Sequence, residues 1–424
     1  MAQTRAGAKP HVGALTSFVY GPSTMRNNQA DIAILGGGLA GGLIALALAE
    51  RQPDLDIVLI EQDEALGGNH VWSFFGPDVA KADRWLLERL VVKGWRGYDV
   101  AFPGYERTLP ATYYSVTSER LNYELRQTLP PRAILSGQRV VEVEAREVRC
   151  ADGSRIAAGA VIDARGMRLA GELTGGWQKF AGRLIELDEP HGLERPVVMD
   201  ATVDQLDGYR FVYCLPFSDR EIFVEDTYYS DSSSLDRAEL GQRIDRYCAD
   251  RGWLVKRTIS EEHGVLPVVS GGDFDAFWRA TGVGTAKAGT RAGLFHPLTS
   301  YSLPHAVRFA AALSARREFS TESLAKFSET HARAEWARAD FARRLAKMLF
   351  EAAVPHERYK VLERFYRLDN KLIERFYGAR STLADKLRLV SGKPPVPFFR
   401  GLGSFLGMGE SNRLRHGSLR AESV

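Results

Sequence analysis

A glycine-rich turn between a buried strand and an apolar helix constrains the fold of this chain more than any other feature. Residues 31–35 read DIAIL, which predicts a short buried strand, and the sequence GGGLAG follows at 36–41. An apolar helix is predicted over 43–50 and a second strand over 57–60. This order of elements is typical of a βαβ unit that binds a dinucleotide.

Three glycines of this turn are each explained by a structural role in binding a dinucleotide. Gly36 permits the tight turn, Gly38 lets the backbone approach a pyrophosphate, and Gly41 allows the helix to pack closely. The helix N-terminus offers amide donors and a positive dipole to phosphates. Glu61 ends the second strand, where an acid binds an adenosine ribose. The predicted contacts of the turn are Gly36, Gly38, Leu39, Ala40 and Gly41. The alternative is a structural turn without a nucleotide.

Two later segments favour FAD over NAD as the cofactor. Residues 161–166 (VIDARG) predict a strand that returns beneath the first nucleotide half. Residues 289–301 form a loop rich in glycine and proline before a helix predicted over 302–313. The dipole of that helix is expected to face the pyrimidine side of an isoalloxazine. Each segment alone is also compatible with an ordinary turn. Their predicted cofactor contacts are Asp163, Ala164, Gly166, Gly293, His296, Pro297, Ser300 and Tyr301.

A cluster of glycine, histidine and aromatic residues follows the second strand, with the sequence LGGNHVWSFF at 66–75. Gly68, Asn69 and His70 are predicted to pass close to the cofactor. The aromatic residues either line the site or pack in the core. His70 is a candidate proton carrier or a turn residue.

The middle of the chain changes to β-branched and aromatic runs broken by turns, which predicts an antiparallel sheet inserted into the nucleotide fold. Its clearest piece is a hairpin of residues 209–216 and 221–229. Strand alternation places Glu225 between two aromatic residues on one face and Asp226 on the other. Glu225 is therefore either a general acid with a raised pKa in an apolar pocket or a solvated strand acid.

The C-terminal part is helical and basic. Residues 306–424 hold 23 Lys and Arg against 13 Asp and Glu, whereas residues 1–305 hold 33 against 40. The repeated sequence ERFY at 363–366 and 374–377 predicts a helix whose aromatic pairs face one way, three turns apart. Exposed aromatics on basic helices would suit an anionic membrane surface. The alternative is a helical cap over the core with a solvated basic face.

Composition excludes several classes of protein. A net charge of +3 over 424 residues gives no sign of nucleic-acid binding. The three cysteines form neither a disulfide framework nor a zinc site, and a reducing compartment is expected. No apolar run reaches the roughly 18 residues that span a bilayer.

Several ordered motifs resemble a known family. They are HVWSF at 70–74 after two glycines, FVEDTY at 223–228, RAGLFHP at 291–297, YSLP at 301–304 and RYKVLERFYRL at 358–368. Together, from about residue 31 to 397, they look like the bacterial lycopene β-cyclases. The resemblance implies bound FAD that is active when reduced, with NAD(P)H as the electron source. It also implies an isomerase that closes both ends of lycopene to β-carotene, by way of γ-carotene.

The resemblance further implies site residues and a location. The family's acidic motif falls on residues 223–227, which implies Glu225 as the leading acid and Asp226 beside it. Ser300 departs from the glycine that many relatives have there. The partners implied are lycopene and other linear carotenes, met at the cytoplasmic face of the bacterial inner membrane by a peripheral enzyme. The main alternative is an FAD-dependent hydroxylase or reductase of a polyene or isoprenoid, and another is a non-catalytic FAD-binding protein.

The predicted fold class is therefore α/β with an added antiparallel sheet. It is an FAD-binding Rossmann-like fold of the hydroxylase or glutathione-reductase type, with an inserted substrate-binding sheet and a helical C-terminal part. The predicted division is a disordered tail over 1–29, an FAD-binding domain over 30–101, 135–175 and 280–320, a substrate-binding sheet over 102–134 and 176–279, and a helical, basic region over 321–424.

Overall fold

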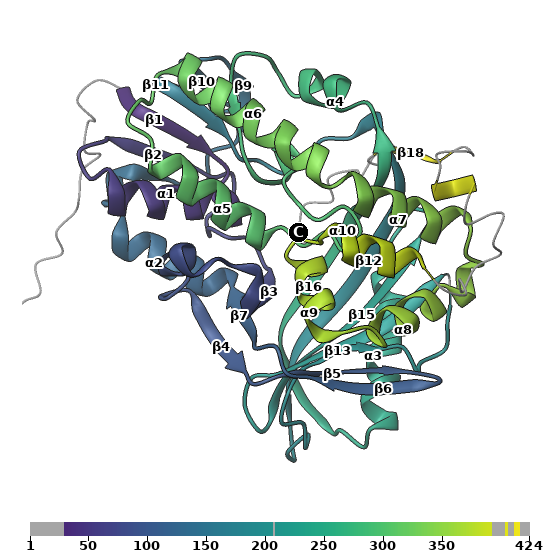
Figure 1. Cartoon of the computed structure of the whole chain (residues 1–424). Coiled ribbons are helices and arrows are strands. Elements are labelled where there is room, and N and C mark those ends of the chain that lie inside the picture. The colour runs from purple at the N-terminus through teal and green to yellow at the C-terminus, as the bar shows by residue number, and fades with distance from the viewer. Residues whose placement is uncertain (1–28, 207, 392–402, 406–410, 416–424) are drawn as a thin grey trace, which may run out of the picture.

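The computed structural model describes residues 29–206, 208–391, 403–405 and 411–415 (Figure 1). The predicted tail over 1–29 lies outside these residues except for Gln29, which begins the first strand. The last part of the predicted C-terminal region also lies largely outside them.

The first sheet holds the predicted nucleotide-binding unit. Its strands lie in the order β8, β2, β1, β11, β10, β9, and β17 pairs with β11. Their bounds are β1 Gln29–Leu35, β2 Ile57–Ile60, β8 Ile134–Leu135, β9 Val140–Val143, β10 Glu147–Cys150, β11 Arg155–Asp163 and β17 Ala286–Lys287. Strands β1, β2, β8, β11 and β17 pair in parallel, while β9 and β10 form an antiparallel extension. The βαβ prediction is confirmed.

The strands of this sheet are apolar on both faces, and each face contributes to a separate core. Ile32 and Ile34 of β1 are buried in one core with Leu43 and Ile44 of α1 (Leu39–Arg51). Ala33 and Leu35 join a second core on the other face. Helix α1 begins at Leu39, four residues before the predicted start, because Gly38 serves as its N-cap. The other helices of this part are α2 Ser118–Thr128, α4 Phe274–Ala280, α5 Leu303–Ser314 and α6 Thr321–Arg338.

The second sheet is mainly antiparallel and follows the order β16, β12, β15, β14, β13, β5, β6, with β18 paired to β12. Its strands are β5 Tyr98–Phe102, β6 Tyr105–Leu109, β12 Ala170–Leu187, β13 Val197–Asp200, β14 Tyr209–Pro216, β15 Glu221–Ser230, β16 Val255–Gly272 and β18 Arg413–Arg415. The predicted hairpin is confirmed, with β14 antiparallel to β15. A small third sheet joins β3 Val71–Phe75, β4 Val91–Trp95 and β7 Tyr113–Thr117.

The two faces of the second sheet are covered by different helices. Val212 and Val224 pack with Ile244 of α3 (Arg237–Asp250), while Phe211 and Phe223 face the C-terminal helices. Those helices are α7 Asp340–Glu351, α8 Tyr359–Tyr366, α9 Asn370–Tyr377 and α10 Leu383–Val390, and Figure 1 shows them against the sheet. Short 3₁₀ turns complete the described elements: η1 Gly76–Asp78, η2 Lys81–Leu86, η3 Pro131–Ala133, η4 Gly289–Ala292 and η5 Pro355–Glu357.

The prediction that one helix carries both ERFY repeats is wrong. The repeats lie on two helices, α8 and α9, because Asp369 accepts hydrogen bonds from two backbone amides of α9 and starts a new helix. The hydroxyls of Tyr366 and Tyr377 nevertheless meet, 2.7 Å apart. The aromatic pairs are buried in the core, which overturns the interpretation that they are exposed. These helices thus form the cap that was the alternative.

Among the helices of the described residues, none is long and apolar enough to cross a membrane.

Candidate active site

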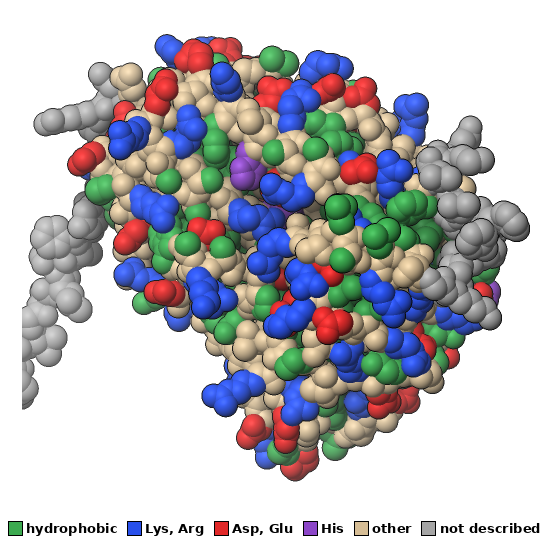
Figure 2. Space-filling model, viewed as in Figure 1, with side chains coloured by type: hydrophobic (Ala, Val, Ile, Leu, Met, Phe, Trp, Pro, Cys, Tyr) green, Lys and Arg blue, Asp and Glu red, His purple; other side chains and the backbone are tan. Residues whose placement is uncertain are grey.

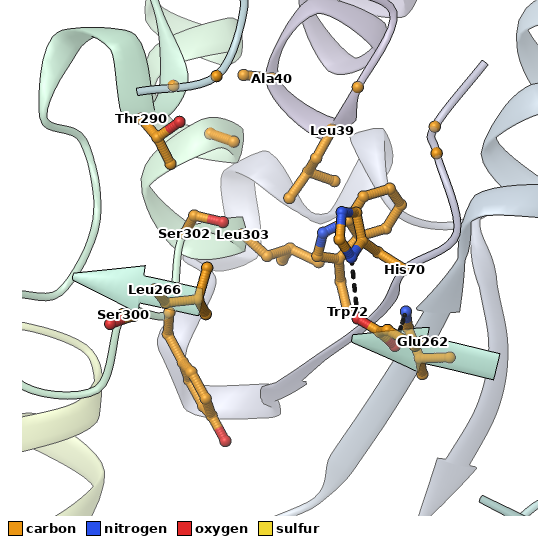
Figure 3. Close-up of a pocket in the computed structure, with 18 of the residues that line it drawn as sticks. Leu39, Ala40, His70, Trp72, Glu262, Leu266, Thr290, Ser300, Ser302 and Leu303 are labelled. Atoms are coloured by element: carbon orange, nitrogen blue, oxygen red, sulfur yellow. Dashed lines mark hydrogen bonds and ion pairs between the residues drawn. The ribbon is translucent and has the colours of Figure 1, made fainter. Parts of the chain in front are cut away.

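A cavity of about 880 Å³ lies where the first sheet, the small sheet and the second sheet meet. The turn before α1, strand β3, the end of β11 and the loop before α5 line one part of it. Strands β12, β14, β15 and β16 line the other. Figure 3 shows side chains from these separate segments around one space. The fold therefore brings the predicted cofactor motifs and the predicted acid to one cavity.

The glycines of the first turn divide into two roles. A Cβ added at Gly38 would meet nothing within 4 Å, so this position leaves the cavity open. A Cβ at Gly41 would lie 1.9 Å from the carbonyl oxygen of Gly36, so this position is needed for packing. No side chain caps α1, which leaves its first amides available to an anion. The turn fits the pyrophosphate of a dinucleotide.

Glu61 lines the cavity and also holds the turn together. Its Oε2 accepts a hydrogen bond from the Gly37 amide at 2.6 Å, and its Oε1 accepts from the amides of Gln62 and Asp63 at 2.7 and 3.1 Å. A carboxylate has lone pairs beyond these bonds, so a ribose hydroxyl can share them.

The start of α5 forms a second wall, and Figure 3 shows Ser300, Ser302 and Leu303 there. No side chain caps this helix either. Ser300 has φ of 57°, a conformation that favours glycine, and its Oγ donates to the carbonyl oxygen of Pro267 at 2.9 Å. That bond holds the loop, so this departure from the family pattern is accommodated. The Tyr301 hydroxyl lies 3.2 Å from the hydroxyl of Tyr113.

Glu225 projects from β15 into the same cavity, among the aromatic residues Phe180, Phe211, Tyr213 and Tyr229. The pKa of Glu225 is raised to about 8, mainly by burial and also by the negative charge of Glu262, against the lowering effect of a hydrogen bond from the Thr227 hydroxyl. A carboxyl group in this environment keeps its proton at neutral pH.

A second carboxyl group, Glu262 of β16, faces the cavity from the other side of β12. Gly182 of β12 pairs with Glu225 on one neighbouring strand and with Glu262 on the other. Glu262 Oε1 lies 2.9 Å from His70 Nδ1, and its Oε2 accepts from the Val71 amide at 2.9 Å. Both contacts are drawn in Figure 3. The cavity thus holds two carboxyl groups in different surroundings.

Asp226 points to the opposite face of the sheet, as strand alternation predicts. It is buried, and its Oδ2 accepts from the Arg210 Nε at 2.8 Å. Burial raises the pKa of Asp226, while the Arg210 guanidinium lowers it. Asp226 lies outside the cavity, in an ion pair that joins β14 and β15.

The predicted site residues thus separate into two groups. Those that line the cavity are Gly36, Gly38, Leu39, Ala40, Glu61, Gly68, His70, Ala164, Gly166, Glu225, Ser300 and Tyr301. Those that lie outside its walls are Gly41, Asn69, Asp163, Asp226, Gly293, His296 and Pro297. Several of the second group shape the walls. Asp163 pairs with Arg165 and Arg291, and His296 Nδ1 accepts from the amides of Leu298 and Thr299.

Sequence reasoning missed part of the site. It missed Glu262 and Phe180, which come from strands distant along the chain, and also Phe211 and Tyr213, which lie on the first strand of the predicted hairpin. A strand signal was present at each position, but only the pairing of β12 with β16 brings Glu262 to His70. Of the aromatic residues beside His70, Trp72 lines the cavity, while Phe74 stacks on Tyr114 with ring centres 5.4 Å apart.

Comparison with known proteins agrees with this geometry. A family model described as lycopene cyclase protein matches residues 31–402. The lycopene beta-cyclase of Pantoea ananas is 43% identical over 376 residues, 89% of this chain and 98% of that protein. That of Pseudescherichia vulneris is 43% identical over 367 residues, 87% and 95% of the two chains. The structure of Klebsiella pneumoniae HpxO complexed with FAD and uric acid aligns with a TM-score of 0.55 at 17% identity, covering 82% of this chain and 96% of that one. The flavoprotein fold class is confirmed.

Proposed function

The chain belongs to the lycopene cyclase family, and we propose that it converts the linear ends of lycopene into β-rings, giving β-carotene by way of γ-carotene. The observation that carries this proposal is a buried acid with a raised pKa, Glu225, in a cavity that is lined by aromatic side chains and by the glycine-rich turn before α1. The reaction is an isomerisation, so substrate and product have the same mass.

The first step is a proton transfer from Glu225. Its carboxyl O–H breaks and the proton adds to the terminal double bond, leaving a cation on the tertiary carbon. The next double bond attacks this cation, forms the ring carbon–carbon bond and moves the charge into the ring. Glu225 suits this step because its raised pKa keeps the proton available in a largely apolar cavity.

The last step needs a protein group that accepts a proton from the ring. We assign this role to the pair of Glu262 and His70, which lines the same cavity. Loss of the ring proton to this pair leaves the β-ring double bond. Two carboxyl groups in different surroundings commonly serve as acid and base in one site. A return of the proton to Glu225 balances the cycle.

Aromatic side chains support the cation between these steps. Trp72 and Tyr229 line the cavity, and an aromatic ring face that meets a desolvated cation contributes about 2 kcal/mol. The Tyr229 hydroxyl donates to the carbonyl oxygen of Leu298 at 3.1 Å, which fixes the orientation of the ring.

The cavity also has the features that hold FAD. Gly38, Leu39 and Ala40 would bind the pyrophosphate through the start of α1, and Glu61 would bind the ribose. Ser302 and Leu303 would place the start of α5 at the flavin ring. When bound in its reduced form, with electrons from NAD(P)H, the flavin would supply negative charge that stabilises a nearby cation.

We place the enzyme peripherally at the cytoplasmic face of the bacterial inner membrane. Lycopene and other linear carotenes are hydrocarbons that dissolve in the bilayer rather than in water. An enzyme that acts on them has to meet the lipid surface.

The test is expression of the chain in bacteria that accumulate lycopene. We expect wild-type cells to form a bicyclic product of unchanged mass and the E225Q variant to lose activity by about 10²–10⁴-fold while it retains FAD. The variant E221Q, changed at the start of the same strand, is the control and should stay active. Red extracts from wild-type cells whose enzyme holds FAD, or a fully active E225Q, would refute the proposal. A product of changed mass would indicate an oxidoreductase instead.

A further inference from the structure

A second cavity, of about 80 Å³, adjoins the first one beneath the C-terminal helices. Four residues line both cavities: Met199, Tyr229, Thr299 and Tyr377. The remaining walls come from α7, α8, α9, α10, Leu298 and Leu368. This narrow space therefore leads from the active-site cavity toward the outer helices.

The walls of the second cavity suit a hydrocarbon. Most of its side chains are aliphatic or aromatic, among them Leu349, Val361 and Phe365. The hydroxyl of Tyr377 is bonded to Tyr366, and that of Tyr229 is bonded to Leu298. Because these two hydroxyls already have partners, an apolar chain leaves neither of them unsatisfied, and the Thr299 hydroxyl is the one polar group of the described wall without a hydrogen-bond partner. Met348 and Met199 give the walls side chains that adapt to a chain.

The outer end of the cavity lies between α8 and α10. Leu362, Arg364 and Leu389 line it there and are partly exposed. On α10, Leu383 is 79% exposed and Leu387 is 68% exposed. These two leucines lie one helical turn apart, on one face of the helix.

Basic side chains accompany these exposed leucines. Arg388 follows Leu387 and is exposed, and Arg364 lies at the end of the cavity. Figure 2 shows hydrophobic side chains gathered over α10 with Lys and Arg side chains near them. Apolar groups beside positive charge match the surface of a bilayer that contains anionic lipid.

We propose that the second cavity is a channel that holds the uncyclised arm of a linear polyene, and that α10 rests on a lipid bilayer from which the polyene enters. This inference rests on the proposed function. A linear polyene is much longer than the ring that forms at its end. The end that reacts lies at Glu225, and the rest of the chain needs an apolar path out of the cavity. The second cavity provides that path and ends beside the exposed leucines of α10.

The channel is tested with V361W, which places a large side chain in its wall, and with V354W, which makes the same change at an exposed position. Both holoenzymes are assayed on lycopene in vesicles of phosphatidylglycerol and phosphatidylcholine. We expect V361W to lower kcat/KM at least about tenfold with FAD content unchanged, and V354W to stay near the wild type. Wild-type kcat/KM in a V361W enzyme that retains FAD overturns the channel.

The surface is tested with the double variant L383E/L387E. Both leucines are exposed, so their replacement does not disturb the packing of the core. The control is L254E, because Leu254 is 64% exposed at a distant site beside β16. We expect the double variant to lose binding to the same vesicles about tenfold and to keep its activity on lycopene in detergent. Unchanged vesicle binding of the double variant overturns the proposal. This measurement does not depend on V361W, so it decides the proposal even if V361W fails to hold FAD. A wild type without bicyclic product refutes the proposed function instead.

Discussion

At the scale of single residues, Glu225 is defined by what surrounds it. Burial disfavours its charged form, and Glu262, which faces the same cavity, adds a negative charge nearby. Both effects raise its pKa, so the acid holds the proton that the proposed first step requires. The same residue is ionised when the chain unfolds, and its pKa therefore connects activity, stability and pH.

Activity should depend on pH through Glu225. Because the acid must be protonated, kcat is expected to fall as pH rises through about 8. Replacing Glu262 with Gln removes the nearby charge and should move this fall to lower pH, by on the order of one unit. The control is E261Q, because Glu261 pairs with Arg183 outside the cavity. The measurement is kcat against pH for the three enzymes. An unchanged alkaline limb in E262Q would contradict this coupling.

The raised pKa of Glu225 should also affect folding stability, where it is a cost at high pH. The pKa of Glu225 rises from 4.5 to about 8 on folding. The stability it contributes is present below pH 4.5 and is lost as pH rises through 8, because the unfolded chain releases the proton first. The isosteric E225Q variant lacks this loss. We expect its thermal midpoint to exceed that of the wild type by on the order of 2 °C at pH 8.5, and to equal it at pH 4.5. Equal midpoints at both values would count against a raised pKa.

At the scale of elements, β12 brings the two carboxyl groups of the proposed active site together, because it pairs with β15 on one side and β16 on the other. Gly182 lies between the two carboxyl positions, and the ring of Phe223 occupies the space above it. A Cβ added at Gly182 would lie 2.4 Å from Cζ of Phe223. The strand alternation around Glu225 was predictable from local sequence. The approach of Glu262 was not, because it depends on the register of two strands of 18 residues that pair across the sheet.

The variant G182A should reveal the role of this glycine. Its methyl group must displace the Phe223 ring, and overpacking of this kind costs about 1–3 kcal/mol. We expect a lower unfolding midpoint and a kcat reduced at least about tenfold, because small displacements of reacting groups are costly. In the control G271A, the added atom would meet only the Thr174 side chain, at 3.3 Å. Thermal unfolding and steady-state assays measure both effects. A G182A enzyme with the stability and kcat of the control would contradict this packing.

At the scale of the whole molecule, the cavity lies between a nucleotide-binding body, built on the first sheet, and a second body, built on the second sheet and the C-terminal helices. Local sequence predicts these two bodies to different extents. The nucleotide-binding body could be predicted because the strand, glycine turn and helix lie within a few dozen residues and each has its own local pattern. The C-terminal helices were harder to predict, because periodicity could not show the helix break at Asp369 or which face is buried. The excess of basic residues in this part did not reveal that its aromatic pairs lie in the core.

Because both bodies line the cavity, a bound cofactor should stabilise the whole chain. A ligand at 100 times its Kd adds about 2.7 kcal/mol to the free energy of unfolding. We expect FAD to raise the unfolding midpoint of the wild type. In G38A the added methyl group meets no protein atom within 4 Å and projects toward the cavity, so FAD affinity should fall at least about tenfold while the apoprotein keeps its midpoint. In G41A the methyl group meets the Gly36 carbonyl oxygen, so the apoprotein itself should be destabilised. Thermal unfolding during FAD titration separates the two variants, and a G38A protein that binds FAD as the wild type does would place the pyrophosphate elsewhere.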